Sequence, residues 1–170
     1  MKSENRRKLI FVLIGLILLI SSCKNHSDTI TQRKPDPAVQ DGVHQMLDSI
    51  ARNVSDKGPV AWLNYFENTP DFFMATDGQL DFPNKDTAAI VINNKIVKQI
   101  VAIELKWNNI HIDALSGTLA AIGADFHEDI TDTNGNKLPV NGYFTGIAHR
   151  SVEGWQLRNL HWSIKKEKPE

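Results

Sequence analysis

The run Gly154-Trp155-Gln156-Leu157-Arg158-Asn159-Leu160-His161-Trp162-Ser163 decides how the rest of the chain is interpreted. Bulky apolar residues alternate with polar ones in it, and Glu153-Gly154 in front of it is a turn signal. Such alternation is typical of a β-strand, so the run predicts the last strand of a curved sheet. Because alternate residues of a strand share a face, His161 and Ser163 are expected on one surface.

Three further strand-like runs precede this one, at 101–114, 119–131 and 137–150. The consecutive runs are separated by the Gly-containing pairs Ser116-Gly117, Asn134-Gly135 and Glu153-Gly154. Short turns of this type join neighbouring antiparallel strands, so we expect a four-strand meander at the C-terminus. In the first run the apolar parity changes midway, which predicts a β-bulge at Asn108-Asn109.

The part of the chain before the meander is predicted to be mainly helical. Asp36-Pro37 is a helix start, with a capping carboxylate followed by a proline at the first helical position. Apolar residues then recur at steps of three and four, at Val39, Val43, Met46, Leu47, Ile50 and Val54. A short second helix starts at Pro59, and a hairpin turns at Asp77-Gly78. Residues 84–99 indicate a third helix, with a strand as the alternative because Ile and Val are frequent there.

Helices followed by a long meander predict an α+β domain with its helices on one face of an antiparallel sheet. From about Asp36 to Ser163 the chain resembles the nuclear transport factor 2-like superfamily, and within it the SnoaL-like branch. The ending Gly-Trp-x-Leu-x-x-x-His-x-Ser carries most of this resemblance, with support from the Asp77-Gly78 hairpin and from Gly142-x-x-Thr145. The resemblance implies a cone-shaped fold of three N-terminal helices and a curved sheet around a cavity, and frequent dimerisation. Isomerases, dehydratases, cyclases, hydrolases and non-catalytic binding or assembly domains share that fold, so fold alone does not define function.

The first 22 residues have the pattern of an export signal. Basic residues precede Leu9 to Ile20, an apolar run of 12 residues, which is shorter than the roughly 20 residues that span a bilayer. Ile20-Ser21-Ser22-Cys23 then resembles the bacterial lipobox, and Cys23 is the only cysteine of the chain. The resemblance implies cleavage before Cys23, acylation of its thiol and anchoring to membrane lipid. An uncleaved signal anchor is the alternative.

The domain boundaries follow from this assignment. We expect a signal peptide at 1–22, an acylated cysteine with a flexible tether at 23–35, the folded domain at 36–166 and a tail at 167–170. The residue after the cysteine is Lys24 and not an aspartate, which by resemblance favours the outer membrane of the cell envelope. With 19 basic and 20 acidic residues the net charge is −1, so no nucleic-acid partner is expected.

The turns also predict which strand residues are neighbours. Pairing centred on the three Gly-containing turns places Gly123, Gly146 and His161 in one row across the sheet. Small residues there would leave room for a cavity. The predicted cavity face carries His161 as a candidate general acid–base, with assistance from Asp125. The remaining candidate pocket residues are Trp62, Phe66, Phe73, Trp107, Phe144, Asn159 and Ser163.

The opposite face, with Tyr143 and Trp162, is predicted to contact a second subunit. A preformed Asp125–His161–Ser163 triad is not expected, because Asp125 and Ser163 lie two strands apart, about 9–10 Å. The pairs His111-x-Asp113 and His127-x-Asp129 suggest metal ligands by spacing, but the predicted register separates them, so no metal site is expected. The chain has no glycine-rich phosphate loop or nucleophile elbow, and no cofactor is expected.

Three functions are compatible with these patterns. The first is a lipid-anchored domain of the cell envelope that binds a small apolar molecule or a partner without catalysis. The second is an enzyme of isomerase or dehydratase type that uses His161 as general acid–base. The third is a dimeric assembly module without a ligand. The first is the leading hypothesis, because the predicted cavity is not accompanied by an assembled set of acid and base groups.

Overall fold

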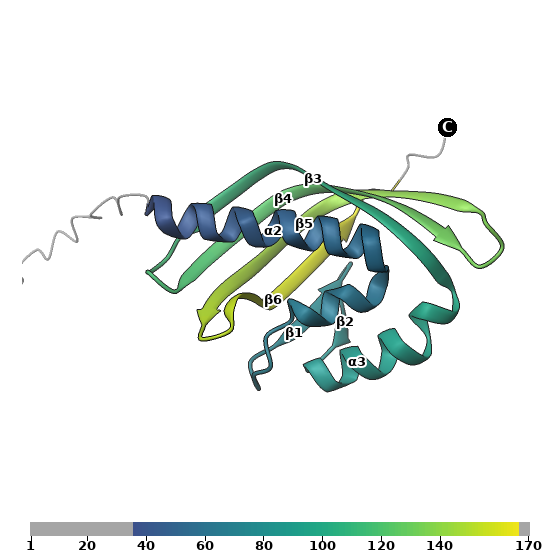
Figure 1. Ribbon diagram of the computed structural model, residues 1–170, viewed down its shortest axis with the longest axis horizontal. Helices are drawn as coiled ribbons and strands as arrows, with labels where there is room; N and C mark the ends of the chain where they lie inside the picture. The colour runs from purple at the N-terminus through teal and green to yellow at the C-terminus, as the bar shows by residue number, and fades with distance from the viewer. Residues whose placement is uncertain (1–35, 167–170) are drawn as a thin grey trace, which may run out of the picture. The chain divides into compact units, whose positions relative to one another are not determined.

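The computed structural model describes residues 36–166. The predicted signal peptide, Cys23, the tether and the tail at 167–170 lie outside this range. Within it, four helical segments and six strands follow each other (Figure 1) in the order α2 (Pro37–Lys57), η1 (Pro59–Asn64), β1 (Phe73–Thr76), β2 (Gln79–Phe82), α3 (Lys85–Asn94), η2 (Ile96–Lys98), β3 (Ile100–Ala114), β4 (Leu119–Asp132), β5 (Lys137–Ser151) and β6 (Gly154–Ile164).

Helix α2 begins and ends as the sequence predicts. The carboxylate of Asp36 accepts hydrogen bonds from the backbone nitrogens of Ala38 and Val39 at 3.1 and 3.4 Å, which stabilises the first turn. All six predicted apolar positions of this helix are buried. The helix ends at Lys57 and is capped by Gly58, whose φ of 72° favours glycine and whose N–H donates to the backbone oxygen of Val54.

The six strands form one sheet in the order β2-β1-β6-β5-β4-β3. All neighbouring pairs are antiparallel except β1 and β6, which run parallel. The expectation of a purely antiparallel sheet was therefore wrong at one pair. The reason is local: the chain leaving η1 already runs alongside β6, through a parallel bridge between Phe66 and Leu157, and β1 continues in that direction.

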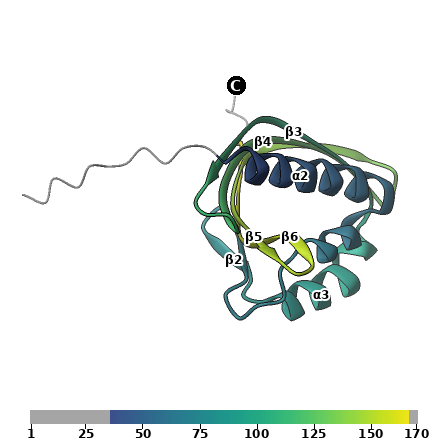
Figure 2. The ribbon, with the colours of Figure 1, turned by 60° about the vertical axis from the view of Figure 1, so that its left-hand side comes forward.

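The sheet is curved, and the long helix α2 lies on its concave side, while α3 lies near the opposite end of that side (Figure 2). The predicted bulge in β3 is confirmed, because the register with β4 shifts between Asn108 and His111. Asn109 has a φ of 47° there, a conformation that asparagine tolerates better than most residues. The strands of the concave side bury a large aromatic cluster of Trp62, Phe66, Phe126, Phe144 and Trp162.

The predicted register was wrong by one residue in two hairpins. His161 pairs with Thr145 and not with Gly146. The β5–β6 turn is centred on Val152-Glu153, which moves the pairing by two residues, and a register shift between Ile147 and Ala148 takes one of them back. The β4–β5 turn is a three-residue loop rather than a two-residue one, since the backbone N–H of Asp132 donates to the oxygen of Asn136. A one-residue shift exchanges the two faces of a strand, so Phe144 shares a face with Trp162 and not with His161.

The concave face is also not the one predicted. Phe126, Leu160 and Trp162 point inward and are buried, whereas His161 and Ser163 lie on the convex face. The glycines thought to leave open space are covered by aromatic rings. A Cβ atom at Gly123 would lie 2.5 Å from the Tyr143 hydroxyl, and one at Gly146 would lie 2.7 Å from Phe144 Cζ. These small residues therefore make room for neighbouring rings.

Candidate functional site

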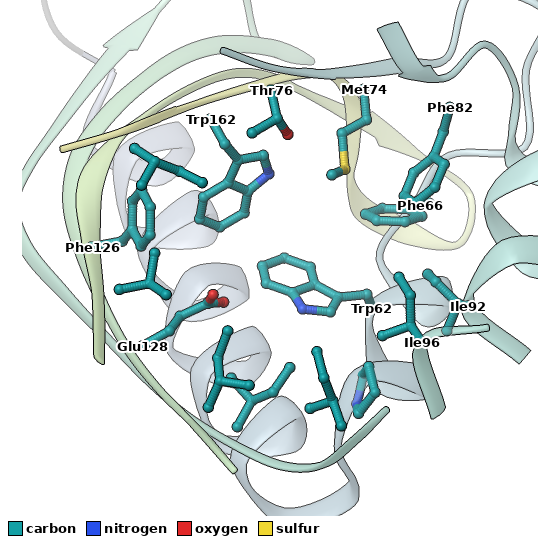
Figure 3. Close-up of a pocket in the computed structure, with 16 residues that line it drawn as sticks. Trp62, Phe66, Met74, Thr76, Phe82, Ile92, Ile96, Phe126, Glu128 and Trp162 are labelled. Atoms are coloured by element: carbon teal, nitrogen blue, oxygen red, sulfur yellow. The ribbon is translucent and has the colours of Figure 1, made fainter. Parts of the chain in front are cut away.

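A cavity of about 240 Å³ lies between the concave face of the sheet and the segments η1, α3 and η2 (Figure 3). Twelve of its sixteen lining side chains are purely apolar, and four carry polar atoms. The apolar ones are Pro59, Phe66, Met74, Phe82, Ile92, Ile96, Ile100, Ile103, Phe126, Ile130, Val140 and Ile164. The polar ones are Trp62, Thr76, Glu128 and Trp162. A concave, mostly apolar site with few polar groups is the usual form of a small-molecule site.

Aromatic contacts hold one wall of this cavity in place. The ring of Trp162 meets that of Trp62 edge to face, with centroids 5.5 Å apart and planes at 89°. Phe126 meets Trp162 in the same way, at 4.6 Å and 85°, and Phe66 stacks on Trp62 at 6.1 Å. Edge-to-face and offset pairs are the favoured arrangements of aromatic rings. The wall is therefore rigid without any hydrogen bond from the Trp62 or Trp162 side chains within residues 36–166.

Among residues 36–166, Glu128 is the only ionisable side chain that lines the cavity. Its carboxyl group points inward among apolar and aromatic side chains (Figure 3), and no hydrogen bond or ion pair from residues 36–166 reaches it. Burial disfavours the charged form and raises the pKa of Glu128 from 4.5 to about 7, although the nearby charge of His127 acts in the opposite direction. The group can therefore gain or lose a proton near neutral pH.

The sequence prediction missed Glu128, although one signal was available. Along β4 the inward positions alternate with outward ones, and Ala120, Ile122, Ala124, Phe126 and Ile130 are the other inward residues. From Ala120 to Ile130, Glu128 is the single charged residue on this otherwise apolar parity. A carboxyl group on a core-facing parity is a candidate site, because burying an unpaired charge is costly.

The predicted pocket residues are only partly brought together. The structure places Trp62 and Phe66 in the cavity wall. Phe73 is 43% exposed and lies outside the cavity, because strand alternation turns Met74 and Thr76 inward instead. Trp107 and Phe144 lie behind the wall. Phe144 belongs to the buried core, and the partly buried Trp107 packs against it at 5.3 Å and against Trp162 at 5.7 Å.

The polar residues predicted for the cavity lie on the other side of the sheet. His161, Asn159, Ser163 and Asp125 are on the convex face, so the expectation that they line the cavity was wrong. The prediction placed these four residues together on one face correctly, but it took that face to be concave, whereas the bulkier face with Phe126, Leu160 and Trp162 packs inward. Asn159 donates to the backbone oxygen of Asp71 at 2.8 Å. The catalytic role of His161 stays a prediction, and it could act only on the convex face.

Asp125 and Ser163 line a shallow polar groove of about 680 Å³ on that convex face. Asp125 accepts a hydrogen bond from the side chain of Asn109 at 2.6 Å. Tyr143 also lines this groove and is exposed, whereas Trp162 faces the core. The predicted contact face with both Tyr143 and Trp162 was therefore wrong, because the two side chains lie on opposite sides of the sheet.

A second polar cluster lies where the chain leaving η1 meets β5 and β6. Glu67 is 7% exposed, and its carboxylate accepts from Arg158 Nε at 2.7 Å and lies 2.6 Å from His149 Nδ1. Burial alone would raise the pKa of Glu67, but the hydrogen bonds from Arg158 and His149 outweigh it and lower that pKa. The sequence prediction did not find this cluster, since its members are 82 and 91 residues apart.

The two His-x-Asp pairs with the spacing of metal ligands, at 111–113 and 127–129, do not converge in the structure. His127 Nε2 lies 3.3 Å from Asp129, and His127 Nδ1 lies 2.8 Å from the side-chain oxygen of Asn141. Both contacts raise the pKa of His127, and the hydrogen bond with Asn141 contributes most. Within residues 36–166, no group of three or more His, Cys, Asp and Glu side chains could hold a metal ion.

No helix in the described range is both long enough and apolar enough to cross a membrane.

Comparisons with known proteins place this architecture in one fold. No protein-family model matches the sequence, and neither does any curated protein sequence. Among solved structures, the chain is similar to a protein assigned as an aromatic ring hydroxylase from Novosphingobium aromaticivorans, with a TM-score of 0.67 and 14% identity over 79% of this chain and 94% of that one.

Two further structures illustrate the range of this fold. One is a nuclear transport factor 2-like superfamily protein from Salmonella enterica, with a TM-score of 0.59 and 17% identity over 78% of this chain and 92% of that one. The other is a hexachlorocyclohexane dehydrochlorinase from Novosphingobium barchaimii, with a TM-score of 0.60 and 12% identity over 78% of this chain and 90% of that one. The chain therefore has the nuclear transport factor 2-like α+β fold, as the sequence predicted, with a mixed sheet of six strands.

Proposed function

We propose that this domain binds a small, mostly apolar molecule in the cavity between the sheet and the segments η1, α3 and η2. The observation that supports this most directly is Glu128, a carboxyl group without a protein partner in an otherwise apolar cavity. Taking a carboxylate out of bulk water without giving it a partner costs free energy, as the raised pKa of Glu128 indicates. Such a cost is readily explained where a ligand supplies the missing hydrogen bond.

The size of the cavity limits the ligand. Its volume of about 240 Å³ is below the roughly 300–1,000 Å³ of sites that hold drug-sized molecules. Twelve apolar lining residues favour burial of a hydrocarbon ring or chain, since burial of apolar surface stabilises binding by roughly 25 cal/mol per Å². We therefore expect a compact molecule with one polar end.

Ligand detection tests this proposal. Purified full-length protein is analysed by native mass spectrometry, and denatured extracts are analysed for released small molecules. The control is Ile96→Trp, which places a larger side chain into the cavity. We expect a molecule that copurifies with the wild-type protein and is depleted at least about tenfold in the folded variant. Equal amounts in both proteins would contradict binding in this cavity.

Proton-transfer catalysis is a second candidate function, and the pKa of about 7 at Glu128 favours it. A general acid–base works best when its pKa lies close to the operating pH, which Glu128 satisfies near neutrality. If the domain is an enzyme, Glu128 is then the general acid–base, the role that the sequence suggested for His161. Once a substrate is known, Glu128→Gln should abolish turnover while binding persists, and His161→Ala serves as the control on the convex face.

The cellular setting belongs to the same proposal. The Ile20-Ser21-Ser22-Cys23 motif supports export, acylation of Cys23 and anchoring to membrane lipid in the cell envelope, with the outer membrane favoured. Cys23→Ala should remove the acyl modification detected by mass spectrometry and release the protein from the membrane fraction. A variant that stays acylated or membrane-bound would contradict this assignment.

Self-association through the convex face is the assembly alternative. Exposed Tyr143 and the polar groove beside it are the surface available for such a contact. Sedimentation velocity of the full-length protein in detergent, with Tyr143→Ala as the variant, tests whether a dimer forms there. A monomer at all concentrations would remove this alternative.

A further inference from the structure

The two indole rings in the cavity wall differ from a third indole nearby in how their N–H groups are used. Trp107 Nε1 donates to the backbone oxygen of Leu47 at 3.1 Å. No residue in the range 36–166 accepts a hydrogen bond from Trp62 or Trp162. Every fully enclosed side-chain nitrogen or oxygen of this range has a partner, so both free indole nitrogens reach accessible space. Figure 3 shows the Trp162 nitrogen on the side of the ring that faces Thr76 and Met74.

The four polar groups of the cavity have one capacity in common, which is to donate a hydrogen bond. An indole N–H can only donate, and the hydroxyl of Thr76 can donate or accept. A carboxyl group that holds its proton also donates. Because burial keeps Glu128 protonated up to about pH 7, the cavity below that pH offers donors to a ligand from Trp62, Trp162, Thr76 and Glu128.

Charged ligands match this set of donors poorly. An ammonium group has donors only, so it would leave the two indole N–H groups without partners. A carboxylate could accept from the indoles, but it would meet the like charge of Glu128 whenever that group is ionised. An uncharged oxygen with two lone pairs meets neither difficulty, because it can accept from two donors at once.

We infer that the cavity selects an uncharged molecule whose polar end is an acceptor oxygen, a ketone or aldehyde carbonyl on a compact apolar skeleton. This inference rests on the proposed binding function and narrows it to one ligand chemistry. The protonated Glu128 donates to the carbonyl oxygen, the indole N–H groups of Trp62 and Trp162 are further donors in the same cavity, and the apolar residues enclose the skeleton. Ionisation of Glu128 removes one donor, so affinity falls as the pH rises.

Three probes with the same nine-carbon bicyclic skeleton separate these possibilities. They are 1-indanone, which carries a carbonyl, 1-aminoindane, which carries a positive charge near neutral pH, and indane, which has no polar group. Each is titrated calorimetrically into the full-length protein at pH 6 and pH 8. We expect 1-indanone to bind at least about fivefold more tightly than either other probe at pH 6, as one or two added hydrogen bonds imply.

The pH dependence identifies the contribution of Glu128. The Kd of 1-indanone should rise about 5- to 10-fold from pH 6 to pH 8, because a group with a pKa near 7 loses its proton in that interval. Glu128→Gln keeps the shape and a donor but does not titrate, so its Kd should be nearly the same at both pH values. Indane binding should be insensitive to pH in both proteins.

A second variant tests the indole donor. Trp162→Phe keeps an aromatic ring but removes the N–H group, and it should weaken 1-indanone about 2- to 10-fold without weakening indane. If this variant does not fold, the comparison of the three probes and the Glu128→Gln titration still test whether the cavity prefers a carbonyl ligand. The matched indole control is Trp107→Phe, because the Trp107 N–H is already bonded to Leu47 outside the cavity wall.

The outcomes are distinguishable. Equal or tighter binding of 1-aminoindane or indane compared with 1-indanone would overturn the carbonyl inference and leave cavity binding in place. A Kd for 1-indanone that does not change between pH 6 and pH 8 would equally overturn it. No binding of any probe at millimolar concentration would contradict the proposed binding function itself, and the inference with it.

Discussion

Glu128 and His127 are consecutive residues of β4, yet they serve opposite faces of the sheet. Glu128 faces the apolar cavity, where burial raises its pKa to about 7. His127 faces the convex groove, where Asn141 and Asp129 contact its ring and raise its pKa. One step along the strand thus separates a carboxyl group whose pKa is raised by burial from an imidazole whose pKa is raised by polar neighbours.

The raised pKa of Glu128 predicts a specific dependence of stability on pH. In the unfolded chain this carboxyl group ionises near 4.5, but in the folded protein it ionises near 7. The folded state therefore binds more protons between these values, so the free energy of unfolding falls as pH rises through that interval. Replacing the group with glutamine removes this loss. We expect Glu128→Gln to exceed wild type by about 2–3 kcal/mol at pH 8 and to differ little at pH 5.

Urea denaturation at both pH values measures this difference. The exposed residue Glu104 provides the control, since Glu104→Gln removes a carboxylate that lies on the surface. A Glu128→Gln variant that is less stable than wild type at pH 8 would mean that the carboxylate has a stabilising partner.

The Glu67 cluster predicts the opposite dependence. Hydrogen bonds from Arg158 and His149 lower the pKa of Glu67 despite its burial. Stability from this group is therefore present above the unfolded pKa and is lost as pH falls through the lower folded value. We expect Glu67→Gln to lower the free energy of unfolding by about 1–3 kcal/mol at pH 7, with a smaller effect at acid pH.

A double-mutant cycle of Glu67→Gln with Arg158→Gln measures how strongly the two side chains are coupled. We expect a coupling energy of about 1–2 kcal/mol, because the pair is largely buried and joined by two hydrogen bonds. Strictly additive effects would show that the two residues stabilise the fold independently.

The orientation of β6 can be tested by comparing two neighbours in the sequence. Trp162 is 8% exposed and contacts four other aromatic rings, whereas His161 lies on the convex face. Trp162→Ala should lower the free energy of unfolding by about 3–5 kcal/mol, while His161→Ala should change it by less than about 1 kcal/mol. A reversal of these two effects would show that the face with His161 packs inward, as the sequence predicted.

The N–H group of Trp107 provides a further prediction, because its hydrogen bond joins β3 to helix α2 through the backbone oxygen of Leu47. Trp107→Phe should lower the free energy of unfolding by roughly 1–3 kcal/mol, from the lost hydrogen bond and the smaller ring. It should leave the affinity of 1-indanone within about twofold of wild type. A larger loss of affinity would place Trp107 in direct contact with the ligand.

The sequence predicted the architecture well because its signals are local. Asp36 and Pro37 start α2, the periodic apolar residues of that helix are all buried, and Asp77-Gly78 turns the first hairpin with positive φ at both residues. The bulge near Asn109 could also be predicted, since a change of parity on a buried strand requires an extra residue. Each of these features depends on a few consecutive residues.

The site could be predicted only in part, because it depends on long-range pairing. Trp62 and Phe66 could be identified by their bulk, whereas the loop lengths at Asn134 and Val152 changed the face to which the side chains of β5 belong. His161 and Trp162 were correctly predicted on opposite faces, but which of these faces is concave depends on helices packed from distant parts of the chain. Strand glycines also did not show whether the space beside them is open. At Gly123 and Gly146 it is filled by neighbouring aromatic rings.

The central claim is that the cavity holds a carboxyl group that is largely protonated below neutral pH. The most direct test follows the side-chain carboxyl carbon of Glu128 by NMR in protein labelled with ¹³C at glutamate, with the signal assigned by its absence in Glu128→Gln. We predict a titration midpoint near pH 7, shifted upward by saturating 1-indanone. A midpoint near 4.5, the ordinary value for a solvated glutamate, would contradict the account.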